Sequence, residues 1–167
     1  NIVKPKISKL KLDLKGLFYI PRIVKASKLG DAAILKVLIK ILSENKIKVI
    51  KLNTFNPELT LKKGVHTKIK PNLLEKEEIN KGIKTLKKIN SYNHTQAVII
   101  RDNKIISRET RKGTKEMIKS IPKSKIKKGI LIKLPKVKQD LRVDLPTIGI
   151  DTFKDCNKVG VRGIVVK

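Results

Sequence analysis

The pattern of apolar and polar positions predicts short helices and strands that alternate along the chain. The first 25 residues hold two prolines and a glycine and show no sustained period, so we expect loops with short helical turns there. Apolar residues then recur at helical spacing, which predicts a helix over residues 31–43 with Asp31 at its N-cap. A β-branched run predicts a short strand from Ile47 to Leu52.

The second half of the chain predicts a mixed sheet. Acidic residues at the start and lysines at the end favour a helix over residues 75–90, after a linker broken by prolines and glycine. Strands at 96–101 and 104–108 form a predicted hairpin around Asp102-Asn103. The remaining elements expected, in order, are a short helix at 113–121, strands at 129–135 and 139–145, a helix at 151–160 ended by Gly160, and a strand from 163. We therefore predict an α/β fold.

The composition is strongly basic, with a formal net charge of +27. Such a charge suits a nucleic-acid partner, and a basic nucleic-acid-binding, ribosome-associated protein is one interpretation. Several features argue against it: aromatic residues make up only 3% of the chain, the lysines are spread over nearly every element, and abundant lysine, isoleucine and asparagine are typical of AT-rich coding sequences. Our leading interpretation includes no nucleic acid, and a general attraction to anionic groups remains.

Other common site types find little support. A hydrophobic content of 40% predicts a packed core, but Lys36 and Lys40 interrupt the longest apolar segment, which falls short of the roughly 20 residues of a membrane span. His66 and His94 lack partners at zinc-ligand spacing, and Cys156 is the only cysteine. The sequence also lacks the P-loop, GxSxG and HExxH motifs.

The stretch QDLRVDLPTIG places two aspartates around an arginine. In an extended segment Asp140, Arg142 and Asp144 point to the same side, either as a salt-bridged, solvent-exposed strand face or as a site in which carboxylates bind Mg²⁺ and the arginine binds phosphate. Residues i and i+4 of a straight strand lie about 13 Å apart, too far to share one ion. Shared binding therefore needs a bend, or else one aspartate binds the metal and the other orients water or Arg142.

Two expected helix starts carry a similar ambiguity. Gly113-Thr114 and Gly30-Asp31 each combine a glycine with a residue that can cap a helix. Free backbone N–H groups at such a position also suit a phosphate group. Either start is therefore an ordinary capped helix or a contact with a phosphorylated substrate.

Several stretches, taken in order, resemble the LpxI-type UDP-2,3-diacylglucosamine pyrophosphatase family. They are KGLFYIPRIVKASKLGDAAILKVLIKIL, TQAVIIRDNKIISRETRKGTKEM, KKGILIKLPKVKQDLRVDLPTIGIDT and VGVRGIVVK. The resemblance implies a Mg²⁺-dependent hydrolase of lipid A biosynthesis in Gram-negative bacteria. Its reaction would convert UDP-2,3-diacylglucosamine to 2,3-diacylglucosamine 1-phosphate and UMP, with water attacking the α-phosphorus.

The family resemblance also implies an architecture. We expect residues 1–56 to be the later part of an N-terminal α/β domain, 57–74 a linker and 75–167 a C-terminal catalytic α/β domain. The chain lacks the family's glycine-rich first strand and its last strand, so we expect it to be a fragment. A homodimer is expected, in the cytoplasm and with peripheral contact to the inner membrane.

By position, the resemblance places the catalytic carboxylate at Asp144 or Asp140. The expected Mg²⁺ ligands are Asp140, Asp144 and Glu109. The expected substrate-binding residues are Arg142, Gly113, Thr114, Gln139, Thr147, Lys133, Lys138, Gly30 and Asp31. Lys112 and Lys115 stand where relatives commonly carry acidic residues around the Gly-Thr pair, which favours phosphate binding over metal binding in that loop.

Overall fold

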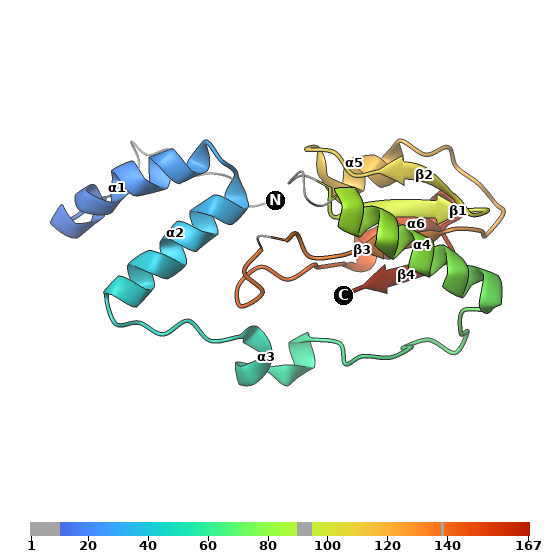
Figure 1. The fold of residues 1–167 in the computed structure, drawn as a ribbon, viewed down its shortest axis with the longest axis horizontal. Helices are drawn as coiled ribbons and strands as arrows, with labels where there is room; N and C mark the ends of the chain where they lie inside the picture. The colour runs from blue at the N-terminus through green and yellow to red at the C-terminus, as the bar shows by residue number, and fades with distance from the viewer. Residues whose placement is uncertain (1–10, 90–94, 138) are drawn as a thin grey trace.

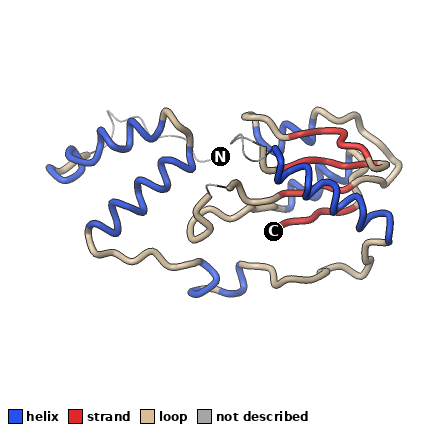
Figure 2. Tube along the Cα trace, in the orientation of Figure 1, coloured by secondary structure: helices blue, strands red, loops and turns tan. Residues whose placement is uncertain are grey.

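The structure is a computed structural model that describes residues 11–89, 95–137 and 139–167. Figure 1 labels its elements, and Figure 2 shows the strands gathered together after a first part made of helices and loops. In chain order the elements are α1 (Leu14–Ser27), α2 (Asp31–Glu44), α3 (Leu52–Phe55), the 3-10 turn η2 (Pro57–Leu59), α4 (Leu73–Ile89), β1 (Ala97–Arg101), β2 (Lys104–Arg108), α5 (Gly113–Lys119), β3 (Ile130–Lys133), α6 (Ile150–Lys158) and β4 (Gly163–Val166).

The first two helices pack against each other. Arg22 of α1 donates two hydrogen bonds, of 2.6 and 2.9 Å, to the carboxylate of Glu44 at the end of α2. Of the segment expected to form loops with short helical turns, residues 1–10 lie outside the described residues. The expectation was wrong for residues 14–25, because Asp13 caps α1 by accepting the Gly16 N–H at 2.7 Å and the helix continues through Pro21. Packing on α2 therefore outweighs the poor helix propensity of glycine and proline.

The expected strand at Ile47–Leu52 was also wrong. The structure gives irregular backbone there, followed by the four-residue helix α3. A strand needs a neighbour to pair its N–H and C=O groups, and every described strand lies after residue 96. The expected linker contains η2 and otherwise no regular element up to α4, and the division into two domains stays a prediction.

The predicted mixed sheet is confirmed, with strand order β2-β1-β3-β4. β1 pairs antiparallel with β2 and with β3, and β3 pairs in parallel with β4. Asp102 and Asn103 have positive φ values of 47° and 57°, which matches the type I′ turn expected for a two-residue hairpin. The carboxyl ends of β2, β3 and β4 consequently lie at one edge of the sheet, beside the start of β1.

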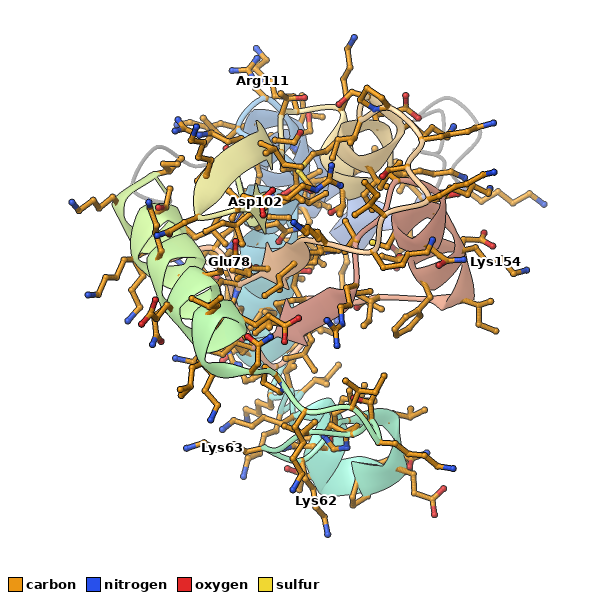
Figure 3. All side chains as sticks on the ribbon, turned by 90° about the vertical axis from the view of Figure 1, so that its right-hand side faces the viewer. Lys62, Lys63, Glu78, Asp102, Arg111 and Lys154 are labelled. Atoms are coloured by element: carbon orange, nitrogen blue, oxygen red, sulfur yellow. The ribbon has the colours of Figure 1, made fainter. Side chains whose placement is uncertain are left out.

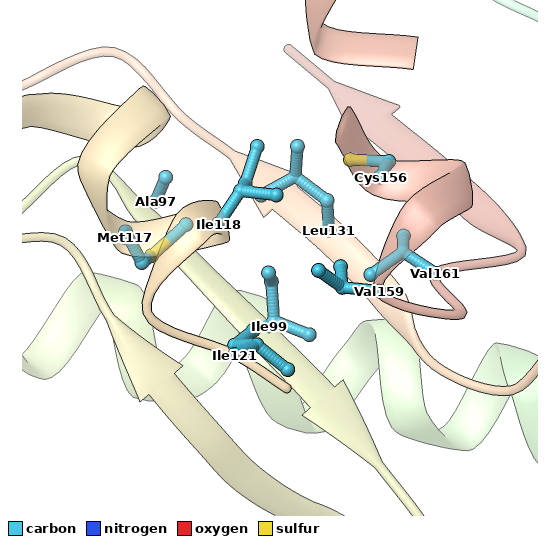
Figure 4. Packing of buried hydrophobic residues seen from close by; sticks show 9 residues of the cluster. All are labelled: Ala97, Ile99, Met117, Ile118, Ile121, Leu131, Cys156, Val159 and Val161. Carbon is cyan, nitrogen blue, oxygen red and sulfur yellow. The ribbon is translucent and has the colours of Figure 1, made fainter. Parts of the chain in front are cut away.

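The two faces of the sheet bury two separate apolar clusters. Side chains alternate along a strand, so successive residues of β1 and β3 contribute to opposite faces. One face packs against α5 and α6 (Figure 4) through Ala97, Ile99, Met117, Ile118, Ile121, Leu131, Cys156, Val159 and Val161. The other packs against α4 through Leu86, Val98, Ile100, Ile130, Ile132 and Leu134. Helices cover both faces of the sheet, which confirms the α/β fold.

The surface is dominated by charged side chains. Figure 3 shows nitrogen-tipped side chains extending outward from nearly every element, in agreement with the expected spread of lysines. Within the described residues, no helix combines the length and the apolar character required of a membrane-crossing segment.

Candidate active site

Glu109 follows β2 at the edge where the strands end. Its side chain is buried, with 5% of the residue exposed. One carboxylate oxygen accepts the Gln96 backbone N–H at 2.9 Å, and the other accepts the Thr114 hydroxyl at 2.7 Å. Both oxygens of this predicted metal ligand therefore already have donors from the protein.

The Gly113-Thr114 pair starts α5, as predicted, but the cap differs from the expected one. Lys112 occupies the N-cap position and makes no capping bond through its side chain, while the Thr114 hydroxyl turns to Glu109. Gly113 has a φ of +87°, a left-handed conformation that favours glycine. The loop between Glu109 and Thr114 is thus closed on itself by a side-chain bond instead of by a helix cap.

Lys133 ends β3 on the same edge. Its ammonium group donates to the Thr147 carbonyl at 2.9 Å. Burial lowers the pKa of Lys133, while the negative charges of Glu109 and Asp144 act in the opposite direction. Lys133 therefore lies within electrostatic range of both carboxylates and joins the end of β3 to the loop that follows it.

The stretch expected as a strand at residues 139–145 is a turn, and that expectation was wrong. The Val143 and Asp144 N–H groups both donate to the Asp140 carbonyl, at 3.1 and 2.9 Å. The bend that shared use of the two aspartates would require is therefore present. It forms because Arg142 folds back locally onto Asp140 instead of pairing with a neighbouring strand.

Arg142 and Asp140 form a two-pronged ion pair. The guanidinium Nε and Nη2 lie 3.0 and 2.7 Å from the Asp140 oxygens, and the Arg142 backbone N–H adds a third bond at 3.0 Å. These bonds lower the pKa of Asp140 from 3.8 to about 2, and Lys36 of α2 contributes a smaller effect. Figure 1 shows the loop after β3 extending from the sheet toward α2, in agreement with that influence.

Asp144 has a different environment. Its side chain is half-buried, and no donor in the described part of the chain bonds to its carboxylate. Thus Asp140 is engaged by Arg142, whereas Asp144 presents a carboxylate beside the cation of Lys133.

The other predicted residues are less closely connected. Gln139 accepts the Lys136 N–H at 2.8 Å and so helps to close the turn. Thr147 joins the site through its backbone carbonyl, and Lys138 lies outside the described residues. Gly30 occupies the N-cap position of α2, and no bond within the described chain joins it to Glu109, Lys133 or Asp144. Asp31 begins the helix, and its side chain lies outside the described part of the structure.

Gln96 is a site residue that the sequence did not indicate. Its backbone binds Glu109, and its side-chain oxygen is buried without a hydrogen-bond partner in the described structure. A polar residue directly before an apolar strand is the only signal that the sequence offers. In the described ranges, no group of three or more His, Cys, Asp or Glu residues is arranged to hold a metal ion.

These features define a polar site at the carboxyl ends of β2 and β3, built from two loops. The profile of the LpxI C-terminal domain matches residues 62–167, and the chain belongs to this family. The match begins inside the segment predicted as a linker and includes both loops of the site.

A curated relative carries the same family name. The chain is 27% identical over 173 residues to the UDP-2,3-diacylglucosamine pyrophosphatase LpxI of Caulobacter vibrioides. The alignment includes 99% of this chain and 62% of the relative. The chain therefore spans less than two thirds of the length of that protein.

Proposed function

We propose that this chain contributes the catalytic loops of a UDP-2,3-diacylglucosamine pyrophosphatase of lipid A biosynthesis. The reaction would be hydrolysis to 2,3-diacylglucosamine 1-phosphate and UMP, by attack of water on the α-phosphorus. Membership of the LpxI family and the activity for which the Caulobacter relative is named support this assignment. The observation that carries it is that one turn holds the Arg142–Asp140 ion pair and the carboxylate of Asp144, which has no hydrogen-bond donor among the described residues and interacts electrostatically with Lys133.

Cationic groups of the site suit a diphosphate. A pyrophosphate diester resists attack because its oxygens are negatively charged, so hydrolysis requires positive groups where charge develops. Arg142 directs Nε and Nη2 at Asp140 within the described structure, which leaves Nη1 for a phosphate oxygen. We assign substrate binding to Arg142 and assign to Asp140 the task of fixing its guanidinium.

Asp144 is the proposed catalytic carboxylate. A carboxylate without other donors can hold a water molecule and accept its proton. It also fits a Mg²⁺ site, because Mg²⁺ in phosphate-processing sites is bound by one or two carboxylates, substrate phosphates and water. Mg²⁺ would neutralise the phosphate oxygens and activate water. Asp140 and Glu109 direct their oxygens to protein donors, so Asp144 is the stronger ligand candidate of the three.

The test is hydrolysis of UDP-2,3-diacylglucosamine by the full-length protein in ¹⁸O-water with Mg²⁺. Attack on the α-phosphorus places the label in UMP. Asp144→Asn should lower kcat about 10²–10⁴-fold, the usual contribution of a group that transfers a proton, without changing the unfolding temperature. Asp151→Asn is the matched control, since Asp151 is exposed on the first turn of α6.

Label in the sugar phosphate would contradict the proposed point of attack. Full activity of Asp144→Asn would contradict the proposed role of this carboxylate. A nucleic-acid-binding protein would not hydrolyse the nucleotide, so neither product would carry the label. Lysine substitutions would instead weaken its binding to nucleic acid in a salt-dependent way.

A lipid substrate also suggests peripheral contact with the inner membrane, on the cytoplasmic side, by a homodimer. The exposed apolar residues Leu14, Leu17 and Phe18 of α1, beside lysines, support contact with an anionic leaflet. Cosedimentation with phosphatidylglycerol vesicles should therefore weaken in Phe18→Ser. Equal binding of this variant would exclude α1 as the contact.

A further inference from the structure

Glu109 and Lys133 stand where the two loops of the site leave the sheet, at the ends of β2 and β3. The first loop, residues 109–114, leads from β2 to α5, and the second, residues 134–149, leads from β3 to α6. Lys133 directly precedes the second loop, and its ammonium group donates to the Thr147 carbonyl of that loop at 2.9 Å. The negative charges of Glu109 and Asp144 also act on this ammonium group.

Glu109 is fixed at both its side chain and its backbone. Besides the two bonds to its carboxylate, its N–H donates to the Ala97 carbonyl at 2.9 Å and its carbonyl accepts the Thr95 hydroxyl at 2.8 Å. Four hydrogen bonds thus attach a buried residue to the start of β1 and to Thr114. A buried carboxylate whose oxygens are satisfied by protein donors is suited to hold structure in place.

Lys133 projects from a rigid position. Its neighbour Leu134 donates to the Gln96 carbonyl at 2.8 Å, and the Lys133 carbonyl accepts the Lys167 N–H at 3.2 Å, so the backbone is held on both sides. The ammonium group then reaches the Thr147 carbonyl at 2.9 Å. Thr147 lies three residues beyond Asp144, so this bond restrains the part of the second loop that carries the proposed catalytic carboxylate.

We propose that Lys133 and Glu109 are positioning residues that hold the Asp144 loop against the Glu109–Thr114 loop. The consequence for catalysis rests on the proposed function, whereas the restraint on the loop does not. Lys133 acts through the Thr147 carbonyl and through its attraction to Asp144 and Glu109, instead of binding phosphate. Glu109 acts by anchoring the first loop and by balancing the charge of Lys133, instead of binding metal.

Such a restraint matters because reacting groups must be held in place. A displacement of about 1 Å in a catalytic group can cost about 10²-fold in rate. The Val143 and Asp144 amides report on this restraint directly, since both donate to the Asp140 carbonyl within the second loop. Loss of the anchor at Thr147 should expose them to solvent exchange.

The experiment measures amide hydrogen exchange and steady-state kinetics in the full-length protein. Lys133→Met should raise exchange of the Val143 and Asp144 amides at least tenfold without substrate, and lower kcat about 10–100-fold with little change in KM. Lys133→Arg should restore both in part, because a guanidinium can donate to the same carbonyl. Glu109→Gln, which removes one acceptor oxygen, should give the same loss of kcat and raise exchange at the start of α5.

Lys127→Met is the matched control. The Lys127 ammonium also donates to a backbone carbonyl, that of Asn157 at 2.5 Å, but away from the two loops. This variant should leave the exchange at Val143 and Asp144 and the kinetics as in the wild type.

Unchanged exchange in folded Lys133→Met would overturn the proposal. So would a rise in KM alone with normal exchange, which would mean that Lys133 binds the phosphate directly. If Lys133→Met fails to fold, Lys133→Arg and Glu109→Gln decide by the same measurements. If the wild-type protein does not hydrolyse the nucleotide, the proposed function fails, and the exchange data still decide whether the loops are joined in this way.

Discussion

Gly82→Ala tests how tightly α4 packs on the sheet behind the site. A Cβ added at Gly82 would overlap the Cδ1 of Ile132, and it would meet the Val98 Cγ2 at 3.8 Å. Ile132 and Val98 are fully buried, and both belong to the cluster between α4 and the sheet. The Ile132 side chain therefore has little room to move away.

Two effects of opposite sign determine the result. Replacing glycine by alanine inside a helix usually stabilises a protein by about 0.5–1 kcal/mol. Forcing an extra methyl group into a packed core usually costs about 1–3 kcal/mol. The cost of a direct overlap with a buried methyl group should lie in the middle of that range or above it. We therefore expect the free energy of unfolding to fall by about 1 kcal/mol in total.

Urea unfolding measures this loss. With a slope of about 2 kcal/mol per M, the midpoint should fall by about 0.5 M. Ile132→Val removes the overlapping Cδ1, so it should recover the packing cost when combined with Gly82→Ala. The double variant should be about 1.5–2 kcal/mol more stable than the sum of the two single effects, because the whole packing cost is recovered. Simple additivity, or a stabilised Gly82→Ala protein, would refute the packing argument.

Two further predictions concern titration. The Asp140 carboxyl should titrate near pH 2 in an NMR experiment, and in Arg142→Met its midpoint should return toward 3.8. Because its pKa is lowered on folding, ionised Asp140 stabilises the fold above pH 3.8, and this contribution is lost as the pH falls through about 2; an unshifted midpoint in the wild type would contradict the ion pair. Burial, aided by Asp155, raises the pKa of Cys156 to about 11. Iodoacetamide at pH 8 should therefore label the native protein at least about tenfold more slowly than the urea-unfolded protein, and equal rates would contradict this burial.

Local sequence signals predicted the fold best where an element pairs with its direct neighbour in the sequence. The Asp102-Asn103 hairpin was predicted because a two-residue turn fixes the pairing of β1 with β2. The prediction of a strand at Ile47–Leu52 was wrong because a β-branched run favours extended backbone but does not determine whether another strand lies beside it to pair with. Helix α1 was missed because its stability comes from α2, including the Arg22–Glu44 ion pair, which lies beyond the range of local propensity.

In the candidate site, too, the sequence indicated some features and the tertiary structure decided others. Asp140, Arg142 and Asp144 stand out by spacing alone, but their turn depends on the folding of Arg142 onto Asp140. The contact of Glu109 with Gln96 arises from the sheet register, since β2 and β3 both pair with β1 and end beside its start. A residue's type and spacing therefore indicated which groups are candidates to carry the chemistry. The strand pairing decided which of them meet.

The two aspartates of the motif show why identical side chains four residues apart have different environments. Arg142 lies between them in sequence and bonds to Asp140 through its side chain and its backbone, so Asp140 is neutralised locally. The Asp140 carbonyl accepts the Asp144 N–H, so whatever fixes Asp140 also fixes the backbone of Asp144. Lys133 restrains the other end of the segment through Thr147. The turn thus bonds the Asp140 carboxylate to Arg142 and leaves the Asp144 carboxylate without a hydrogen-bond donor among the described residues. In the proposed function, Asp140 orients Arg142, and the Asp144 carboxylate is open to water or a metal ion.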